Sequence, residues 1–101
     1  MRLLYSFRFQ QIGETYLGAA VGQNAHLFNG VLQLNEVGHF IVSALAEITE
    51  RMSTDSSDMT EEKILSLLTD SLTKEYAVDR STAQSAVQNV LNYLKTEGVL
   101  A

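Results

Sequence analysis

The chain lacks several residue types that carry common functions. Its 101 residues include no cysteine, no tryptophan and, less usually, no proline. Without cysteine, the chain can form no disulfide and no thiolate metal site, and it can have no cysteine nucleophile. Glycine-rich phosphate-binding loops are also absent from the sequence. We therefore expect no cofactor.

Positive charge is scarce as well. Lysine and arginine number 7 against 12 aspartate and glutamate, which gives a net charge of −5. Phosphate backbones and anionic lipids repel an acidic chain, so nucleic acid and membrane surfaces are disfavoured as partners.

No segment approaches the roughly 18 apolar residues that a membrane span needs. Arg8, Gln10 and Gln11 also make the apolar start too short for a signal peptide. We expect a cytoplasmic protein with an intact N-terminus.

Length and composition indicate one globular domain. A chain of this size buries roughly 60–65% of its unfolded surface, which allows a modest core without covalent staples. Hydrophobic residues make up 46% and charged residues 19%, as in ordinary folded domains. We expect a single domain over residues 1–101, with strands over about residues 7–34 and helices over about residues 35–97.

The N-terminal third has the patterns of β-strands. Phe7 and Phe9 alternate with the polar Arg8 and Gln10, which is the period of a half-buried strand. Pairs that contain glycine interrupt the apolar runs and predict turns. The predicted elements are a strand over residues 7–12, a turn at Gly13-Glu14, an antiparallel strand over Thr15–Val21, a turn at Asn29-Gly30 and a short strand over Val31–Leu34.

The remaining residues predict three amphipathic helices. Asn35, Thr60 and Asp79 are residues that cap helix N-termini, and each precedes apolar residues at helical spacing. The first helix is expected to run to about Glu50 or Arg51, followed by a polar loop over residues 53–58. The apolar faces are Val37, Phe40, Ile41, Ala44, Leu45 and Ile48 in the first helix, Ile64, Leu65, Leu67, Leu68, Leu72 and Tyr76 in the second, and Ala83, Val87, Val90, Leu91 and Leu94 in the third.

The chain is expected to end against its own core. Gly98 suits a left-handed helix stop, after which Val99 and Leu100 can fold back. The fold class is therefore α+β, with three short N-terminal strands followed by three α-helices in winged-helix-like proportions.

Residue types that often carry chemistry are present but poorly arranged. His26 and His39 have no nucleophile paired with them in the sequence, so we expect solvent-exposed or incidental roles. The polar residues 53–58 include two aspartates, but a calcium loop also needs a turn glycine and a bidentate glutamate at set spacing. We therefore expect neither an enzyme nor a metal site.

The order of several short motifs resembles the PqqD family, named for coenzyme PQQ synthesis protein D. Together the motifs span nearly the whole chain. They are Phe28-Asn29-Gly30-Val31-Leu32, Leu34-Asn35-Glu36-Val37-Gly38 followed by Phe40-Ile41, Thr60-Glu61-Glu62-Lys63-Ile64, Glu75-Tyr76-Ala77-Val78-Asp79 and Leu94-Lys95-Thr96-Glu97-Gly98-Val99-Leu100. Two features depart from the family: Val37 stands where threonine is common, and the loop over residues 52–59 is longer and more polar.

The resemblance implies a RiPP recognition element, a domain used in making ribosomally synthesised and post-translationally modified peptides. Such a domain binds the leader segment of a precursor peptide and presents it to a modifying enzyme, often a radical SAM enzyme. The leader adds as a strand beside the third strand and lies against the third helix. The resemblance thus implies a non-catalytic peptide chaperone or adaptor. The open strand edge also leaves room for a homodimer.

Helical geometry and the resemblance together give a candidate site. On the third helix, Ala86 and Tyr93 lie on one shoulder of the apolar stripe, which suits a peptide groove. A wider core contact explains Tyr93 equally well and is the favoured interpretation for Ala86. The predicted peptide-binding residues are Val31, Leu32, Gln33 and Leu34 through their main chain, with Thr82, Ala86, Asn89, Val90 and Tyr93 lining the groove. About four main-chain hydrogen bonds would not reach micromolar affinity alone, so two or three peptide side chains must also be buried.

Two other classes of protein stay open at this point. A winged-helix DNA-binding or protein–protein adaptor domain has similar proportions, although the third helix offers only Arg80 and Lys95 at opposite ends. More distantly, Asp70-Ser71-Leu72 matches the attachment motif of acyl and peptidyl carrier proteins. A carrier serine starts a helix, however, whereas Ser71 lies inside an apolar stripe.

Overall fold

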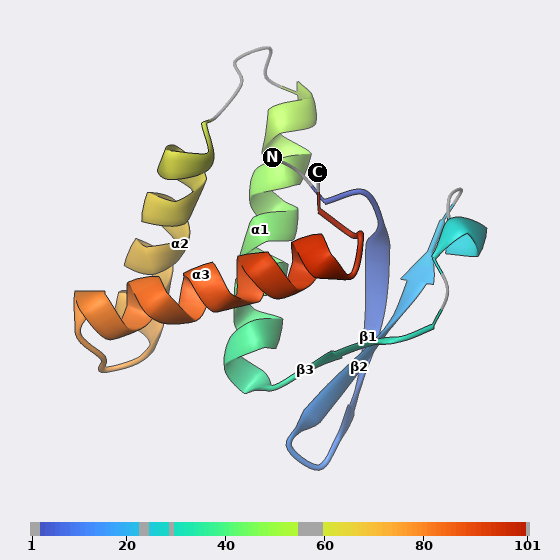
Figure 1. Ribbon diagram of the computed structural model, residues 1–101, viewed down its shortest axis with the longest axis horizontal. Coiled ribbons are helices and arrows are strands. Elements are labelled where there is room, and N and C mark those ends of the chain that lie inside the picture. The colour runs from blue at the N-terminus through green and yellow to red at the C-terminus, as the bar shows by residue number, and fades with distance from the viewer. Residues whose placement is uncertain (1–2, 23–24, 29, 55–59, 101) are drawn as a thin grey trace.

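The computed structural model describes residues 3–22, 25–28, 30–54 and 60–100, with backbone alone for residues 49–54. Three strands are followed by three helices, so the predicted α+β fold is confirmed (Figure 1). The elements are β1 (Ser6–Ile12), β2 (Thr15–Val21), a single 3₁₀ turn η1 (Ala25–Leu27), β3 (Leu32–Leu34), α1 (Glu36–Thr54), α2 (Glu61–Glu75) and α3 (Arg80–Thr96).

The strands form one antiparallel sheet in the order β1-β2-β3. β1 and β2 pair without interruption from Ser6 opposite Val21 to Ile12 opposite Thr15. The predicted turn joins them, and Gly13 there adopts a φ of 65°, which glycine reaches without the steric cost of a Cβ. β3 pairs with the first part of β2, so β1 and β3 are the two edges of the sheet.

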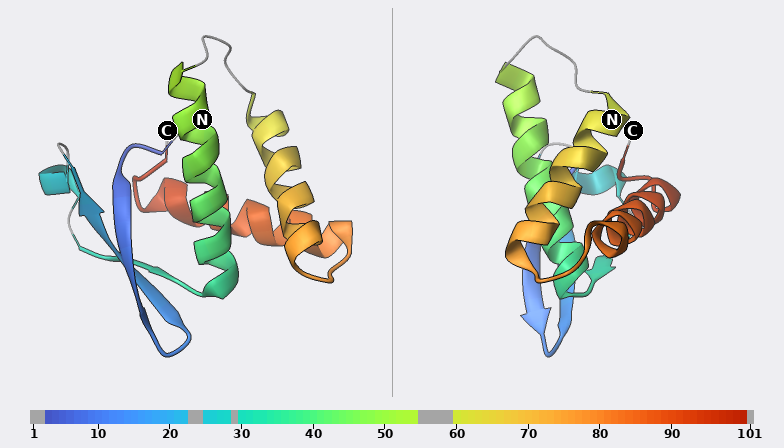
Figure 2. Two further views of the ribbon diagram at one scale, coloured as in Figure 1. Left: turned by 180° about the vertical axis from the view of Figure 1, so that it is seen from behind. Right: turned by 90° about the vertical axis from the view of Figure 1, so that its left-hand side faces the viewer.

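The helices cover one face of the sheet and pack on one another. Figure 1 shows α1 and α2 running side by side while α3 crosses them, and the views in Figure 2 agree. α1 contacts both β2 and β3, and α3 packs against α1 and α2. The sheet therefore contacts α1 mainly through β2 and β3.

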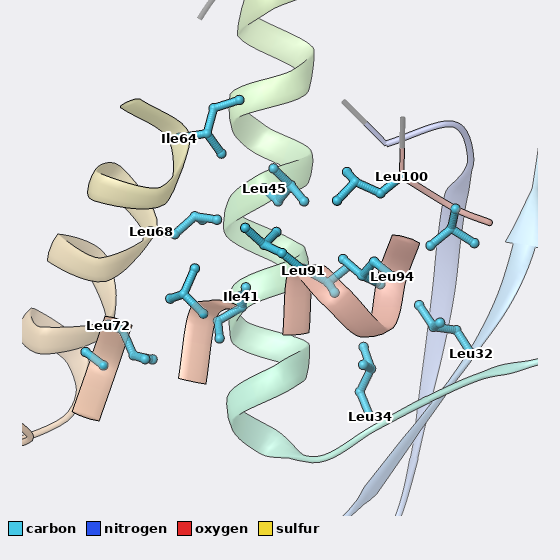
Figure 3. Packing of buried hydrophobic residues seen from close by; sticks show 14 residues of the cluster. Leu32, Leu34, Ile41, Leu45, Ile64, Leu68, Leu72, Leu91, Leu94 and Leu100 are labelled. Atoms are coloured by element: carbon cyan, nitrogen blue, oxygen red, sulfur yellow. The ribbon is translucent and has the colours of Figure 1, made fainter. Parts of the chain in front are cut away.

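The hydrophobic core forms where the helices meet β3 (Figure 3). Leu32 and Leu34 point into it from the sheet, at 0% and 6% exposure. Both residues of the predicted C-terminal return are buried too, and the Leu4 amide donates to the Val99 carbonyl at 2.9 Å. The buried apolar side chains are Leu32, Leu34, Ile41, Val42, Leu45, Ile64, Leu68, Leu72, Ala83, Val87, Leu91, Leu94, Val99 and Leu100.

All three predicted helix caps are confirmed. The Asn35 side chain accepts a hydrogen bond from the Gly38 amide at 2.7 Å, and Thr60 accepts one from Lys63 at 3.2 Å. Asp79 accepts one from the Thr82 amide at 2.7 Å, and this bond holds the pKa of its carboxyl below the ordinary value of 3.8. Each cap satisfies an amide that the first helical turn would otherwise leave without a partner.

Some boundaries differ from the prediction. α1 continues to Thr54, beyond the expected end at Glu50 or Arg51, because an existing helix gains one hydrogen bond for each residue it adds. The rest of the predicted polar loop, residues 55–58, lies outside the described residues. β3 begins at Leu32, one residue later than expected. Leu67, expected on the apolar face of α2, is 41% exposed.

Candidate functional site

The outer edge of β3 is joined to α3 by a hydrogen bond. The Gln33 amide donates a hydrogen bond to the Tyr93 hydroxyl at 3.4 Å, so it points away from β2. In an antiparallel ladder, the N–H and C=O of one residue point to the same side, and successive residues alternate. The backbone of Gln33 therefore faces outward, while Leu32 and Leu34 direct theirs toward Gly18 and Tyr16 on β2.

A shallow hollow of about 370 Å³ lies beside this edge. Its walls come from the start of β2, the end of β3 and the last turns of α3. The lining residues are Thr15, Gln33, Leu34, Asn35 and Tyr93. The hollow thus places an outward backbone amide next to a half-buried aromatic side chain, which is what an added strand with one inserted side chain would contact.

Further along α3 from this hollow lie the other residues of its predicted groove, which we call the shoulder of α3. Ala86, Val90 and Tyr93 are each half-buried and pack against the core, whereas Thr82 and Asn89 are exposed. Their spacing places them on one side of the helix, and the rise of 1.5 Å per residue puts Ala86 about 10 Å from Tyr93. An extended peptide spans that distance with about three residues.

The predicted peptide-binding residues occupy three kinds of position. Gln33, Leu34 and Tyr93 meet in the hollow, although the Leu34 side chain itself belongs to the core. Leu32 is fully buried, and Val31, just before β3, is 53% exposed. The other four, Thr82, Ala86, Asn89 and Val90, extend along α3 beyond the hollow.

The positive charges of α3 are already paired. Arg80 forms an ion pair with Asp70, and Lys95 forms one with Glu61, both between α3 and α2. These two are the only basic residues that α3 contains. A helix that reads DNA needs basic side chains directed at phosphates, and α3 offers none that is unpaired.

A second cluster was not expected from the sequence. The His39 ring, on α1, stacks on Tyr16 with centroids 4.1 Å apart and meets the edge of Phe9 at 4.8 Å. His39 is half-buried, and this burial lowers the pKa of its imidazole from the ordinary value of 6.5. His39 is therefore not solvent-exposed, while the alternative expectation of an incidental role stays a prediction. The sequence carried no signal for this contact, since it depends on strand register and helix rotation together.

The end of α2 contacts α1 beside this cluster. The Tyr76 hydroxyl donates to a Glu36 carboxylate oxygen at 3.2 Å. Burial, reinforced by the Glu36 charge, raises the pKa of Tyr76 above its ordinary value of 10.0.

Among the residues that the structure describes, no three histidine, aspartate or glutamate side chains gather as metal ligands would. None of the described helices is both long and apolar enough to cross a bilayer.

Comparison with solved structures identifies a protein of the same fold. TbiB1, solved in complex with the TbiA(beta) leader peptide, aligns with a TM-score of 0.60 over 99% of this chain and 94% of its own. The two sequences are 22% identical. This likeness establishes the fold.

Comparisons at the level of sequence found no match. No family model matches the chain, and no curated protein matches it. Membership of the PqqD family therefore stays a prediction.

Proposed function

We propose that this chain binds the leader segment of a ribosomally made precursor peptide as an added strand at the outer edge of β3. The outward-facing backbone of Gln33 beside Tyr93 is the observation that carries the proposal. The similarity in fold to TbiB1, which was solved with a leader peptide, supports it. In this role the chain is a non-catalytic adaptor that presents the peptide to a modifying enzyme, for example a radical SAM enzyme.

The strand register supports a role for particular main-chain groups in this proposed pairing. Leu32 and Leu34 face β2, so the peptide bonds to Gln33 and, by the same alternation, to Val31. Asn35 contributes little, because its carbonyl already accepts from the His39 amide at 2.9 Å. About four main-chain bonds at about 0.5–1.5 kcal/mol each fall short of the roughly 8 kcal/mol that micromolar binding requires.

Contacts with side chains must therefore supply much of the affinity. Burying one apolar side chain contributes about 1.5–3 kcal/mol. The exposed Val31 and the half-buried Ala86, Val90 and Tyr93 provide apolar surface on both sides of the added strand. β1 has no comparable wall among the described residues, because α1 contacts the sheet mainly at β2 and β3. The peptide is thus expected at β3 and not at the opposite edge.

The rival functions lose support in the structure. DNA binding lacks unpaired basic residues on α3. A carrier protein needs its attachment serine at the start of a helix, whereas Ser71 is half-buried within α2. A protein–protein adaptor of the same fold differs from the proposal only in the partner it takes.

The proposal is tested by selecting ligands without assuming their sequence. A phage library of random 12-residue peptides is panned against the immobilised protein, and enriched peptides are titrated into the ¹⁵N-labelled protein. The expected amide shifts are largest at Val31, Gln33 and the Ala86–Tyr93 shoulder. Failure to enrich any peptide, or shifts centred on α2 or on β1, would overturn the proposal. Peptides encoded by short reading frames beside the gene then serve to identify the natural leader.

A further inference from the structure

The second edge of the sheet, on β1, is longer and less protected than the edge at β3. β1 has seven residues, pairs with β2 without a bulge, contains no proline and carries a single charged residue, Arg8. Natural proteins commonly protect exposed edges with proline, with several charged side chains or with bulges. Seen from behind, β1 lies at the near side of the sheet, and no element that the structure describes passes in front of it (Figure 2).

The ladder shows which backbone groups this edge presents. Because Gln33 faces outward, Tyr16 and Gly18 direct their backbone groups to β3 and not to β1. Their partners on β1 are Gln11 and Phe9, which therefore point their N–H and C=O groups away from β2. By alternation Phe7 does the same. Three residues of β1 thus offer both a donor and an acceptor to a further strand.

We propose that this edge joins a second copy of the chain, with the two β1 strands antiparallel and a two-fold axis at Phe9. Phe9 then faces Phe9 of the second copy, and Phe7 faces Gln11 at both ends. Each of these three pairs exchanges two bonds, which gives about six main-chain hydrogen bonds. A two-fold axis at Arg8 or at Gln10 would bring only two such pairs together within the strand.

Charge and packing favour the same register. With the axis at Phe9, the exposed Arg8 faces the neutral Gln10 of the second copy, whereas an axis at Arg8 would set two arginines directly opposite each other. Phe7 and Phe9 are half-buried in one copy, and the partner strand would cover more of both rings. Tyr5, Phe7 and Phe28 already form an aromatic cluster on this face, with centroids 5.5–6.3 Å apart.

This dimer does not depend on the proposed function, because β1 and β3 are opposite edges. The two sheets would join into one, with a β3 edge exposed at each end. Each copy would keep its own hollow, so peptide and protein would bind in equal numbers. A chain that dimerises without binding peptide, or binds peptide as a monomer, separates the two proposals.

The first test uses the absence of cysteine in the natural chain. R8C and Q10C variants are mixed and oxidised. Opposed residues of a non-hydrogen-bonded pair have Cα atoms about 4.5 Å apart, within the reach of a disulfide. We expect the mixture to form a covalent heterodimer and either variant alone to form little. Strong cross-linking within R8C alone or Q10C alone would overturn the register.

The second test measures association of the full chain by sedimentation velocity over about 10–500 μM. Q10E sets a carboxylate opposite Arg8 twice per dimer and is expected to tighten dimerisation between about twofold and thirtyfold. Q10R should weaken it by a similar factor, and R8E combined with Q10R should restore it. Q84E and Q84R make the same charge changes on α3, away from β1, and should have no effect. A chain that stays monomeric throughout this range and forms no R8C–Q10C cross-link overturns the proposal.

Discussion

The Gln33 amide and the Tyr93 hydroxyl, sixty residues apart in the chain, form a hydrogen bond of 3.4 Å between β3 and α3. The bond is long for an N–H···O contact, whose usual length is about 2.9–3.0 Å. The Tyr93 hydroxyl is therefore a weak acceptor for the Gln33 amide. A peptide carbonyl at normal hydrogen-bond distance would replace the hydroxyl at little cost in free energy. The same tyrosine also supplies ring surface to the hollow.

Substitutions at Tyr93 separate the two contributions. Tyr93→Phe removes the hydroxyl and keeps the ring, so we expect faster hydrogen exchange at Gln33 and nearly unchanged affinity for a selected peptide. Tyr93→Ala also removes the ring and should weaken binding by about tenfold to a hundredfold. Amide exchange by NMR and calorimetric titration measure the two effects. Equal loss of affinity in both variants would show that the hydroxyl, and not the ring, holds the peptide.

Gln33 allows the outward edge to be blocked without breaking the sheet. Proline removes the amide hydrogen and places its ring at the edge, and edge strands tolerate proline where the N–H faces outward. We expect Gln33→Pro to fold with a thermal midpoint close to that of the natural chain and to lose peptide binding. Gln33→Ala keeps the backbone and should bind normally. If Gln33→Pro still bound the selected peptide with full affinity, β3 would not be the site.

The close packing at Gly18 predicts a loss of stability on substitution. A Cβ added there would come within 2.5 Å of Phe9 Cε1, because Phe9 lies opposite Gly18 and its ring covers the glycine. We expect Gly18→Ala to reduce the free energy of unfolding by about 1–3 kcal/mol in urea titrations. Ala19→Ser changes the exposed neighbour on the other face and serves as the control. An unchanged unfolding midpoint in Gly18→Ala would mean that the Phe9 ring moves aside freely.

His39 predicts how stability depends on pH. Its pKa is lowered in the folded protein because burial disfavours the imidazolium, so the unfolded chain binds this proton more readily. The contribution of His39 to stability is therefore complete above the ordinary pKa of 6.5, and it is lost as pH falls through the lowered value. His39→Phe keeps an aromatic ring without the charge and should flatten this part of the profile. Thermal midpoints between pH 7.5 and pH 4.5 provide the measurement.

A control for that profile comes from the other histidine. His26 is exposed in η1, and His26→Gln is the matched control variant for His39→Phe. A slope that disappears in His26→Gln, or persists undiminished in His39→Phe, contradicts the assignment to His39.

Local chemistry made much of the fold predictable. The helix caps at Asn35, Thr60 and Asp79 depend on a side-chain oxygen within three residues of the amide it binds, so the sequence alone places them. The turn at Gly13 and the helix stop at Gly98, with φ of 65° and 76°, follow from the conformational freedom of glycine. Leu67 is the exception, because it is exposed although its helical spacing predicts a buried position. Periodicity does not show how much of a helix surface the neighbouring elements will bury.

The candidate site was predictable in part. Helical spacing places Ala86, Val90 and Tyr93 on one shoulder of α3, and the turn signal at Asn29-Gly30 marks Val31–Leu34 as a short strand before the first helix. Spacing cannot say which of these residues turn their backbone outward. That depends on the pairing of β3 with β2, in which Leu32 and Leu34 face Gly18 and Tyr16.

The sequence by itself determined the α+β class, the acidic charge, the caps and most of the core, because each depends on residue type or on spacing within one element. Only the tertiary structure decided that the Gln33 backbone faces α3, that His39 stacks on Tyr16, and that the basic residues of α3 are paired. These relationships join residues distant in the chain. Their geometry follows from strand register and helix rotation, which are set when the elements pack together.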